Sequence, residues 1–116
     1  MDLYHIWCDL KPGVRDLQFT DAVGRYLRHL QADNRIAGWR LTRCKLGLRP
    51  PDLGEWHIIV EVIDLAQLDA AFRSVASRAE PVEEVHFGVN ALVHHARFAL
   101  YRDFPDPVRQ LGEERF

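Results

Sequence analysis

The sequence lacks the features that would tie it to a membrane or to a secreted, disulfide-linked scaffold. None of its apolar runs approaches the ~18–20 residues of a membrane-spanning helix, and its N-terminus has no basic leader. Cys8 and Cys44 stand alone without CxxC spacing, so the chain cannot form the disulfide framework of a small secreted protein. We therefore expect a reducing, cytoplasmic location.

Charge of one sign is also missing. The 15 basic and 17 acidic residues almost cancel, which argues against a nucleic-acid partner, because such proteins carry a clustered basic face. Lys11 and Lys45 are the only lysines; the excess of arginine reflects either carboxylate recognition or, our preferred interpretation, coding bias. No glycine-rich phosphate loop is present, and we expect no cofactor.

The remaining composition is that of one ordinary globular domain. The chain has 116 residues, of which 47% are hydrophobic and 28% charged, enough to bury a core without disulfides. We assign residues 1–104 to this domain. Residues 105–116, which are rich in proline and charge, are interpreted as an extension of the same domain that lies on its surface or contacts a partner subunit.

Four segments alternate apolar and polar residues with the period of a β-strand. The clearest places Trp56, Ile58, Val60 and Val62 on a wholly apolar side and His57 on the other. The four predicted strands are 3–10, 38–48, 56–63 and 94–104.

Two segments have the three-and-four-residue spacing of amphipathic helices. They are 16–33, for which Thr20 offers an alternative, later start, and 65–79, for which Asp64 is the expected N-cap. Segment 80–93 is ambiguous, because Glu83 and Glu84 suit a helix start whereas Gly88 and Asn90 suit a turn. We leave it irregular.

The order of these elements is the split βαβ arrangement of ferredoxin-like α+β folds, βαββαβ. It predicts a four-stranded antiparallel sheet with two helices on one face and an open second face. The open face would carry His5, Trp7, Asp9, Arg40, Thr42, Cys44, His57, Ile59, Glu61, Ile63, Arg97, Ala99 and Tyr101.

Half of that open face is apolar, which is typical of an interaction site. We predict an isologous homodimer formed through it, with a small cavity between the two sheets. The alternative is an unbound face with scattered apolar residues, which need no partner.

The stretch His5–Val14, a histidine that begins an apolar strand ending in lysine, proline and glycine, resembles the opening of stress-responsive dimeric α/β barrel proteins. Ile36–Trp39 is similar to the entry of that family's second strand, with Ala37 in place of proline. The resemblance extends in layout over residues 3–101. It implies a dimeric α/β barrel of ferredoxin-like protomers.

The chain departs from that family after its second predicted helix, where the family often has a tyrosine and a histidine-proline pair. Here Phe72 and Ser77-Arg78-Ala79 occupy this region, so no role that depends on the missing histidine is expected. The wider superfamily includes small monooxygenases, isomerases, haem-degrading enzymes and proteins without known activity. The resemblance thus supports the dimer more strongly than any reaction.

His5 is the candidate catalytic residue, because an imidazole on the open face can act as acid or base near neutral pH. The alternative is a structural histidine that hydrogen-bonds across strands or across the dimer. The candidate ligand-binding residues share the same face: Trp7, Asp9, Arg40, His57, Glu61, Arg97 and Tyr101.

These ligand-binding roles also have structural alternatives. Arg40, Arg97 and Tyr101 would hold a carboxylate or phenolate, but our preferred interpretation is that they pair with Asp9 and Glu61 across the sheet. Trp7 would stack on an aromatic ligand or bury dimer surface.

No metal site is expected; one built from His5, His57 and Glu61 is conceivable, but the spacing lacks the helical signature of a zinc protease. His57 and Glu61 are separated along one strand by about 13 Å, and adjacent His94 and His95 should point to opposite faces. Cys8 faces the helices, where a thiol is usually inert, and Cys44 lies in no catalytic motif.

The sequence therefore favours a noncatalytic, stress-associated or small-ligand-binding homodimer of unknown specificity. The alternative is a cofactor-independent monooxygenase or isomerase that acts on a small aromatic compound.

Overall fold

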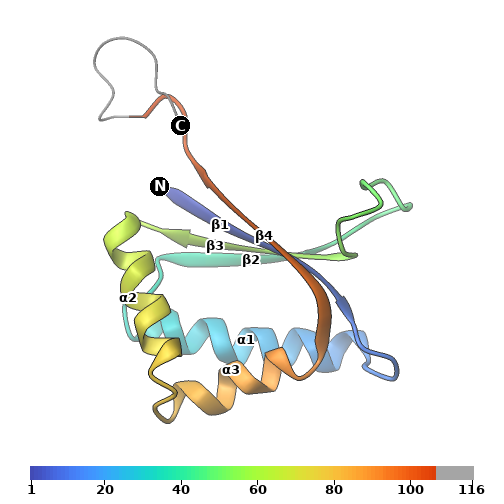
Figure 1. Cartoon of the computed structure of the whole chain (residues 1–116), viewed down its shortest axis with the longest axis horizontal. Helices are drawn as coiled ribbons and strands as arrows, with labels where there is room; N and C mark the ends of the chain where they lie inside the picture. Colours follow the sequence, from blue (N-terminus) through green and yellow to red (C-terminus); the bar gives the residue numbers. More distant parts are fainter. Residues whose placement is uncertain (107–116) are drawn as a thin grey trace.

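The computed structural model describes residues 1–106 and has the ferredoxin-like α+β fold (Figure 1). The sheet order is β2-β3-β1-β4, and every neighbouring pair is antiparallel, as the βαββαβ order predicts. The predicted sheet is confirmed, but three helices rather than two accompany it. The elements are β1 (Asp2–Leu10), α1 (Asp16–Ala32), β2 (Gly38–Arg43), β3 (Trp56–Val62), α2 (Leu65–Ala76), α3 (Val82–Asn90) and β4 (Val93–Arg102).

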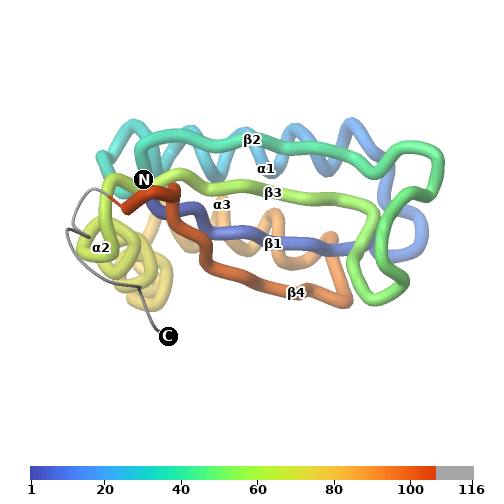
Figure 2. The backbone as a smooth tube through the Cα atoms, turned by 90° about the horizontal axis from the view of Figure 1, so that it is seen from above, coloured from blue at the N-terminus to red at the C-terminus, as the bar shows by residue number. Residues whose placement is uncertain are grey.

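The sheet has one helix-covered face and one open face. Figure 2 looks onto the open face and shows α1 and α3 behind the strands, with α2 at one end. Alternation in β3 explains this division, because Trp56, Ile58, Val60 and Val62 are buried against the helices while the residues between them are only partly buried. Phe19, Val23, Leu27 and Leu30 of α1 complete this core.

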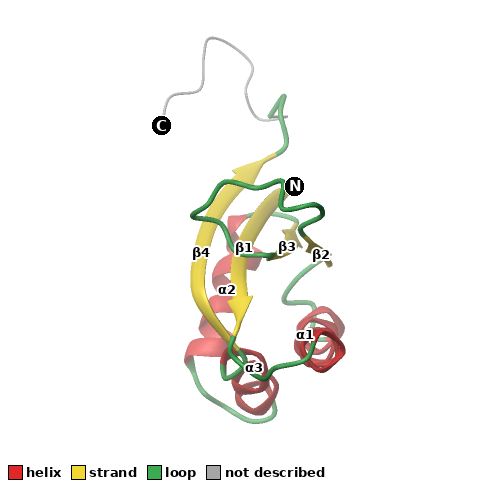
Figure 3. Ribbon diagram, turned by 90° about the vertical axis from the view of Figure 1, so that its right-hand side faces the viewer, coloured by secondary structure: helices red, strands yellow, loops and turns green. Residues whose placement is uncertain are grey.

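Helix α3 is the element that the sequence did not predict. It lies beside α1, as Figure 3 shows in a view along both helices, and it buries Val82 and Val89. No side chain caps its N-terminus, and Gly88 and Asn90 weaken its helical signal. Packing against α1 therefore overrides a local preference for a turn.

Other boundaries differ by a few residues. The Asp64 cap of α2 is confirmed, since its Oδ1 accepts a hydrogen bond from the Gln67 amide at 2.8 Å. Helix α2 ends at Ala76, close to Arg78 with its left-handed φ of 53°. Strand β2 ends at Arg43, short of the predicted residue 48.

A bulge between β1 and β4 corrects the expectation for two adjacent histidines. The register shifts between Trp7 and Asp9, and His95 adopts a left-handed φ of 55°. Consequently the rings of His94 and His95 stack with centroids 4.0 Å apart instead of pointing to opposite faces. His95 Nδ1 lies 3.7 Å from Asp9 Oδ2.

The end of β4 is held by an arginine clamp. Arg102 Nε donates to Asp2 Oδ1 at 2.6 Å, and its Nη1 donates to Asp106 Oδ2 at 2.9 Å. Both carboxylates are buried, so the chain is attached to the sheet as far as Asp106. The rest of the predicted extension, residues 107–116, lies outside the described residues.

No helix within residues 1–106 combines the length and the apolar character that crossing a membrane requires.

Candidate functional site

The open face carries a cluster of four rings, which we call the imidazole-aromatic cluster: His5, Trp7, His57 and Tyr101. The register pairs His57 with Trp7 across β3 and β1, and pairs Tyr101 with Leu3 across β4 and β1. Paired residues of antiparallel strands share a face, so the predicted positions of all four side chains are confirmed.

The two imidazoles of the cluster form a hydrogen bond. His5 Nδ1 lies 2.9 Å from His57 Nε2, with ring planes within 19° and centroids 5.1 Å apart. A neutral imidazole has one donor and one acceptor nitrogen, so one ring donates to the other. His5 thus makes a cross-strand hydrogen bond, which is the structural alternative to its catalytic role.

The other two rings fix this pair in place. Trp7 lies nearly parallel to both imidazoles, with centroids 5.5 Å from His5 and 4.5 Å from His57. Tyr101 meets His5 edge-on at 5.1 Å. Burial lowers the pKa of His5, and burial together with the charge of His5 lowers the pKa of His57. Both rings are therefore predominantly neutral at neutral pH.

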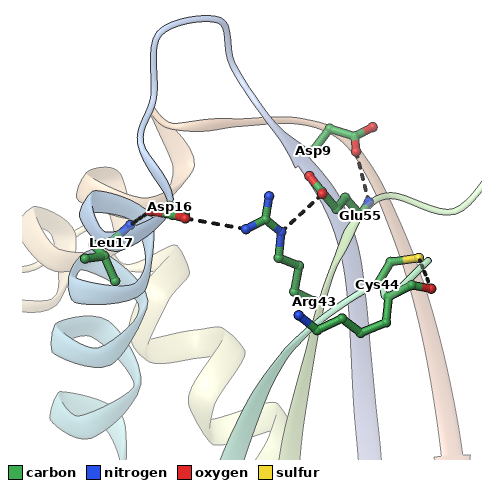
Figure 4. A network of polar contacts seen from close by, with 7 residues as sticks. Asp9, Asp16, Leu17, Arg43, Cys44 and Glu55 are labelled. Carbon is green, nitrogen blue, oxygen red and sulfur yellow. Dashed lines mark hydrogen bonds and ion pairs between the residues drawn. The ribbon is translucent and has the colours of Figure 1, made fainter. Parts of the chain in front are cut away.

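Asp9 belongs to a different, structural network. Its Oδ1 accepts a hydrogen bond from the Glu55 amide at 3.0 Å. Figure 4 shows Arg43 between Asp16 and Glu55, which it contacts at 3.4 and 3.1 Å. Arg43 also lies 5.0 Å from the centre of the Trp56 ring. Because Asp16 begins α1, its contact with Arg43 links the sheet to the start of that helix.

The remaining candidate residues share the open face without joining the cluster. The register pairs Arg40 with Ile59, Glu61 with both Gly38 and Leu3, and Arg97 with Trp7. Among residues 1–106, no ion pair joins either arginine to Asp9 or Glu61. The ligand-binding role predicted for these residues stays a prediction.

A cavity of about 380 Å³ lies on the other side of the sheet, between the strands and the helices. None of the predicted site residues lines it. Its wall is mostly apolar, with Tyr4, Tyr26, His86 and Asn90 as polar side chains. The apolar lining comes from Ile6, Cys8, Val23, Leu27, Ile58, Phe72, Val75, Ala76, Val89, Val93, Ala96 and Phe98.

The polar groups of this helix-side cavity favour a neutral ligand. Burial, reinforced by Tyr4, raises the pKa of Tyr26 to about 12, and its ring lies 5.3 Å from that of His86. Burial also raises the pKa of Tyr4. Burial and the charge of Asp9 raise the pKa of Cys8 to about 11, so its thiol remains protonated and unreactive. The phenols are therefore hydrogen-bond donors rather than bases.

The mouth of the cavity is aromatic. Phe72 of α2 and Phe98 of β4 line it and are nevertheless 46% and 60% exposed. Tyr4 lies between them, edge-on to Phe72 at 5.3 Å and nearly parallel to Phe98 at 6.0 Å. An apolar molecule would therefore enter between α2 and the β4 edge.

The sequence did not predict this cavity for two reasons. Tyr4 and Cys8 lie on the apolar, helix-facing side of β1, where a sequence pattern indicates ordinary core residues. His86 and Asn90 lie on α3, a helix that the sequence pattern does not predict. The available signal was Tyr4 itself, because a phenol on a helix-facing strand needs a polar partner or a cavity.

Comparison with known proteins gives a family and a fold. The chain belongs to a family of unknown function, DUF6614. The match covers residues 1–116. No curated protein matches this DUF6614 chain.

Solved structures with low sequence identity share the fold of the DUF6614 chain. Protein At3g17210 from Arabidopsis thaliana is 8% identical with a TM-score of 0.71, and the match covers 93% of this chain and 100% of the other. A dimeric ferredoxin-like protein of unknown function from Jannaschia sp. CCS1 is 13% identical with a TM-score of 0.60, covering 89% and 100%.

A mutant of SnoaB, a cofactor-independent oxygenase from Streptomyces nogalater, is 13% identical with a TM-score of 0.58, and the match covers 93% of this chain and 98% of that one. At these identities the likeness extends to the fold alone. Within residues 1–106, no group of three or more His, Cys, Asp and Glu side chains is arranged to hold a metal ion.

Proposed function

We propose that this DUF6614 protein is a homodimer that binds a small, neutral, mainly apolar ligand in the helix-side cavity without converting it. The observation that carries the proposal is the cavity itself, about 380 Å³ with an apolar wall and a few polar groups. Ligand pockets commonly measure about 300–1,000 Å³ and have this kind of lining. The cavity therefore suits a compact molecule.

The lining also specifies the charge of the ligand. Among residues 1–106 no lysine or arginine lines the cavity, so a carboxylate or phosphate would be buried there without a lysine or arginine to balance its charge. Tyr26 can donate a hydrogen bond, and Asn90 can both donate and accept. A molecule with one or two carbonyl or hydroxyl groups on an apolar body meets these conditions.

The homodimer is proposed from the open face. That face combines the exposed ring of Tyr101, at 62%, and the partly buried Trp7 and Ile59 with both signs of charge. Similar folds from Bacteroides fragilis, Jannaschia and Thermobifida fusca are dimeric proteins, which supports the same state here. Contact between two open faces would form the dimeric α/β barrel that the sequence resemblance implies.

A cofactor-independent oxygenase or isomerase is the second candidate. The pairing of Tyr26 with His86 inside an apolar cavity favours it, because an imidazole is a common general base. The shared fold of SnoaB adds support at the level of the fold. Burial keeps both the Cys8 thiol and the Tyr26 phenol of this cavity protonated, so neither is a ready nucleophile or base, and binding is the simpler proposal.

A neutral fluorescent probe, N-phenyl-1-naphthylamine, tests the proposal by titration into the full chain. Ala76 lines the cavity from α2 and is exposed, so Ala76→Trp should fill the mouth and weaken probe binding at least about tenfold. Ala66→Trp is the control, because Ala66 is exposed on the same helix but does not line the cavity.

Equal probe affinity in both variants would refute binding in the cavity. Turnover of a bound aromatic ketone or phenol, lost on His86→Gln but kept in Ala66→Trp, would replace binding by the oxygenase or isomerase function.

A further inference from the structure

The His5–His57 pair lies at the middle of the surface through which we propose that two copies associate. Strand β1 is an inner strand of the sheet, and β3 is its inner neighbour. The pair is therefore flanked by β2 on one side and β4 on the other, both of which present side chains to the same face. Contact with a second copy would enclose it on every side.

We propose that the pair makes this association sensitive to pH: two copies associate while the imidazoles are neutral and separate when both are protonated. The inference rests on the proposed homodimer and adds its regulation. Its basis is the 2.9 Å hydrogen bond between His5 Nδ1 and His57 Nε2.

This hydrogen bond tolerates only certain protonation states. It forms when one nitrogen carries a hydrogen and the other offers a lone pair, which requires at least one neutral ring. When both rings are protonated, both nitrogens are donors and both rings are positive. The bond is then lost, and two like charges face each other across 2.9 Å.

Association increases the cost of protonation. In the separate protomer the cluster is partly open to water, because all four of its members are incompletely buried. Covering it with a second copy would remove that water, and burying a charge without a partner is strongly unfavourable. Protons therefore bind more tightly to separate copies than to the dimer.

The other charges on this face come from all four strands. Asp9 lies on β1, Arg40 on β2, Glu61 on β3 and Arg97 on β4, with Tyr101 also contributed by β4. The two arginines oppose protonation of the pair, and the two carboxylates favour it. Asp9 is already engaged by the Glu55 amide and lies near His95, which reduces its influence.

The same set of charges suits a second copy as the partner. A face with two arginines and two carboxylates is complementary to itself when rotated about a two-fold axis, as an isologous contact requires. Trp7 opposes the switch, because an indole face stabilises a neighbouring imidazolium. Burial nevertheless dominates, since both imidazole pKa values are lowered already in the separate protomer.

The direction of the pH dependence follows. A group whose pKa is lower in the dimer than in the protomer stabilises the dimer when the pH lies above its pKa in the protomer. This stabilisation is lost as the pH falls through its pKa in the dimer. Because both pKa values lie below the ordinary histidine value of about 6.5, dissociation is expected in the mildly acidic range rather than at neutral pH.

Sedimentation velocity of the full chain between about pH 7.5 and about pH 5 tests the inference. We expect the dimer dissociation constant to rise at least about tenfold over this range, with circular dichroism showing that the fold persists. The decisive variant is the double substitution His5→Asn, His57→Gln. The Asn and Gln amides can replace Nδ1 and Nε2 as hydrogen-bonding groups but do not titrate, so the dimer should remain and its pH dependence should disappear.

His29→Gln is the matched control, because His29 lies on α1 on the other side of the sheet. This variant should retain the full pH dependence. If the double variant does not associate, nuclear magnetic resonance titration of the wild-type imidazoles replaces it. Both cluster histidines should then titrate below about pH 6.5, and further below it at protein concentrations that favour the dimer.

The outcomes separate the inference from the proposed dimer. A wild-type protein that is monomeric at every pH would overturn both. A dimer whose dissociation constant is unchanged with pH, a double variant that keeps the pH dependence, or imidazole titrations independent of protein concentration would overturn the switch and leave the dimer standing.

Discussion

The two faces of the sheet are built from the same four strands but carry different kinds of side chains. The helix-covered face places Trp56, Ile58, Val60 and Val62 against α1 and leaves a cavity lined by phenols and apolar groups. The open face places imidazoles, an indole and charges where water or another protein can reach them. Successive side chains of a strand point to opposite faces, so neighbouring residues of β1 serve different functions.

This difference is clearest at Tyr4 and His5. Tyr4 faces the cavity, and burial raises the pKa of its phenol. His5 faces outward, and burial lowers the pKa of its imidazole. Burial disfavours the charged form in both cases, so each group stays neutral. The protein thus keeps Tyr4 on the helix-covered face and His5 on the open face uncharged. This suits an apolar ligand in the helix-side cavity and a partner on the open face.

The largest expected effect comes from the helix-covered face. Phe19 is fully buried and meets Trp56 edge-on at 5.1 Å, so Phe19→Ala should lower the free energy of unfolding by about 3–5 kcal/mol. Urea denaturation followed by tryptophan fluorescence measures this change. A loss below about 1 kcal/mol would mean that this face is not the core of the fold.

The two cysteines provide the next comparison, because they lie on opposite faces. Cys8 is buried with its pKa raised to about 11, whereas Cys44 is partly exposed beside the open face. A disulfide reagent should modify Cys8 at least about a hundredfold more slowly than Cys44, because the Cys8 side chain is buried and its raised pKa keeps the thiol protonated. Peptide mapping after timed labelling gives both rates, and similar rates would contradict the assignment of Cys8 to the closed face.

The smallest effect on stability is expected at Trp7. Trp7→Ala removes ring contacts with His5 and His57, which should cost about 1 kcal/mol of folding free energy at protein concentrations where the monomer prevails. Association should weaken by at least about tenfold, since an interfacial tryptophan commonly contributes this much. Sedimentation equilibrium measures the dissociation constant.

Trp39→Ala is the matched control for Trp7→Ala. Trp39 packs against the core from β2, so its loss should reduce stability more than association. If both variants weakened the dimer equally, the assignment of association to the open face and of stability to the helix-covered face would be wrong.

Much of the fold was predictable because period-two alternation is strong in this chain. It assigned every strand and placed His5, Trp7, His57 and Tyr101 together on one face, as the register confirms. Helix α3 was missed because its stability comes from packing against α1 rather than from caps or propensity. His94 and His95 were misplaced because a bulge depends on the pairing of two strands, which no local pattern reveals.

The cavity was less predictable than the cluster. Its wall combines β1, β3 and β4 with all three helices, and its volume depends on how α2 and α3 sit against the sheet. A pattern of apolar residues predicts that helices pack against the sheet, but not whether side chains fill the space between them. The hydrogen bond between His5 and His57 likewise requires a diagonal contact across two strands, which alternation places on one face without specifying its distance.

The most direct test of the two-face account is a crystal structure of the full chain grown at neutral pH with saturating N-phenyl-1-naphthylamine. The account predicts the probe inside the helix-side cavity near Tyr26 and His86, and two open faces in contact over their His5–His57 pairs. A probe bound to the open face, or an open face left in solvent while another surface forms the dimer, would contradict it.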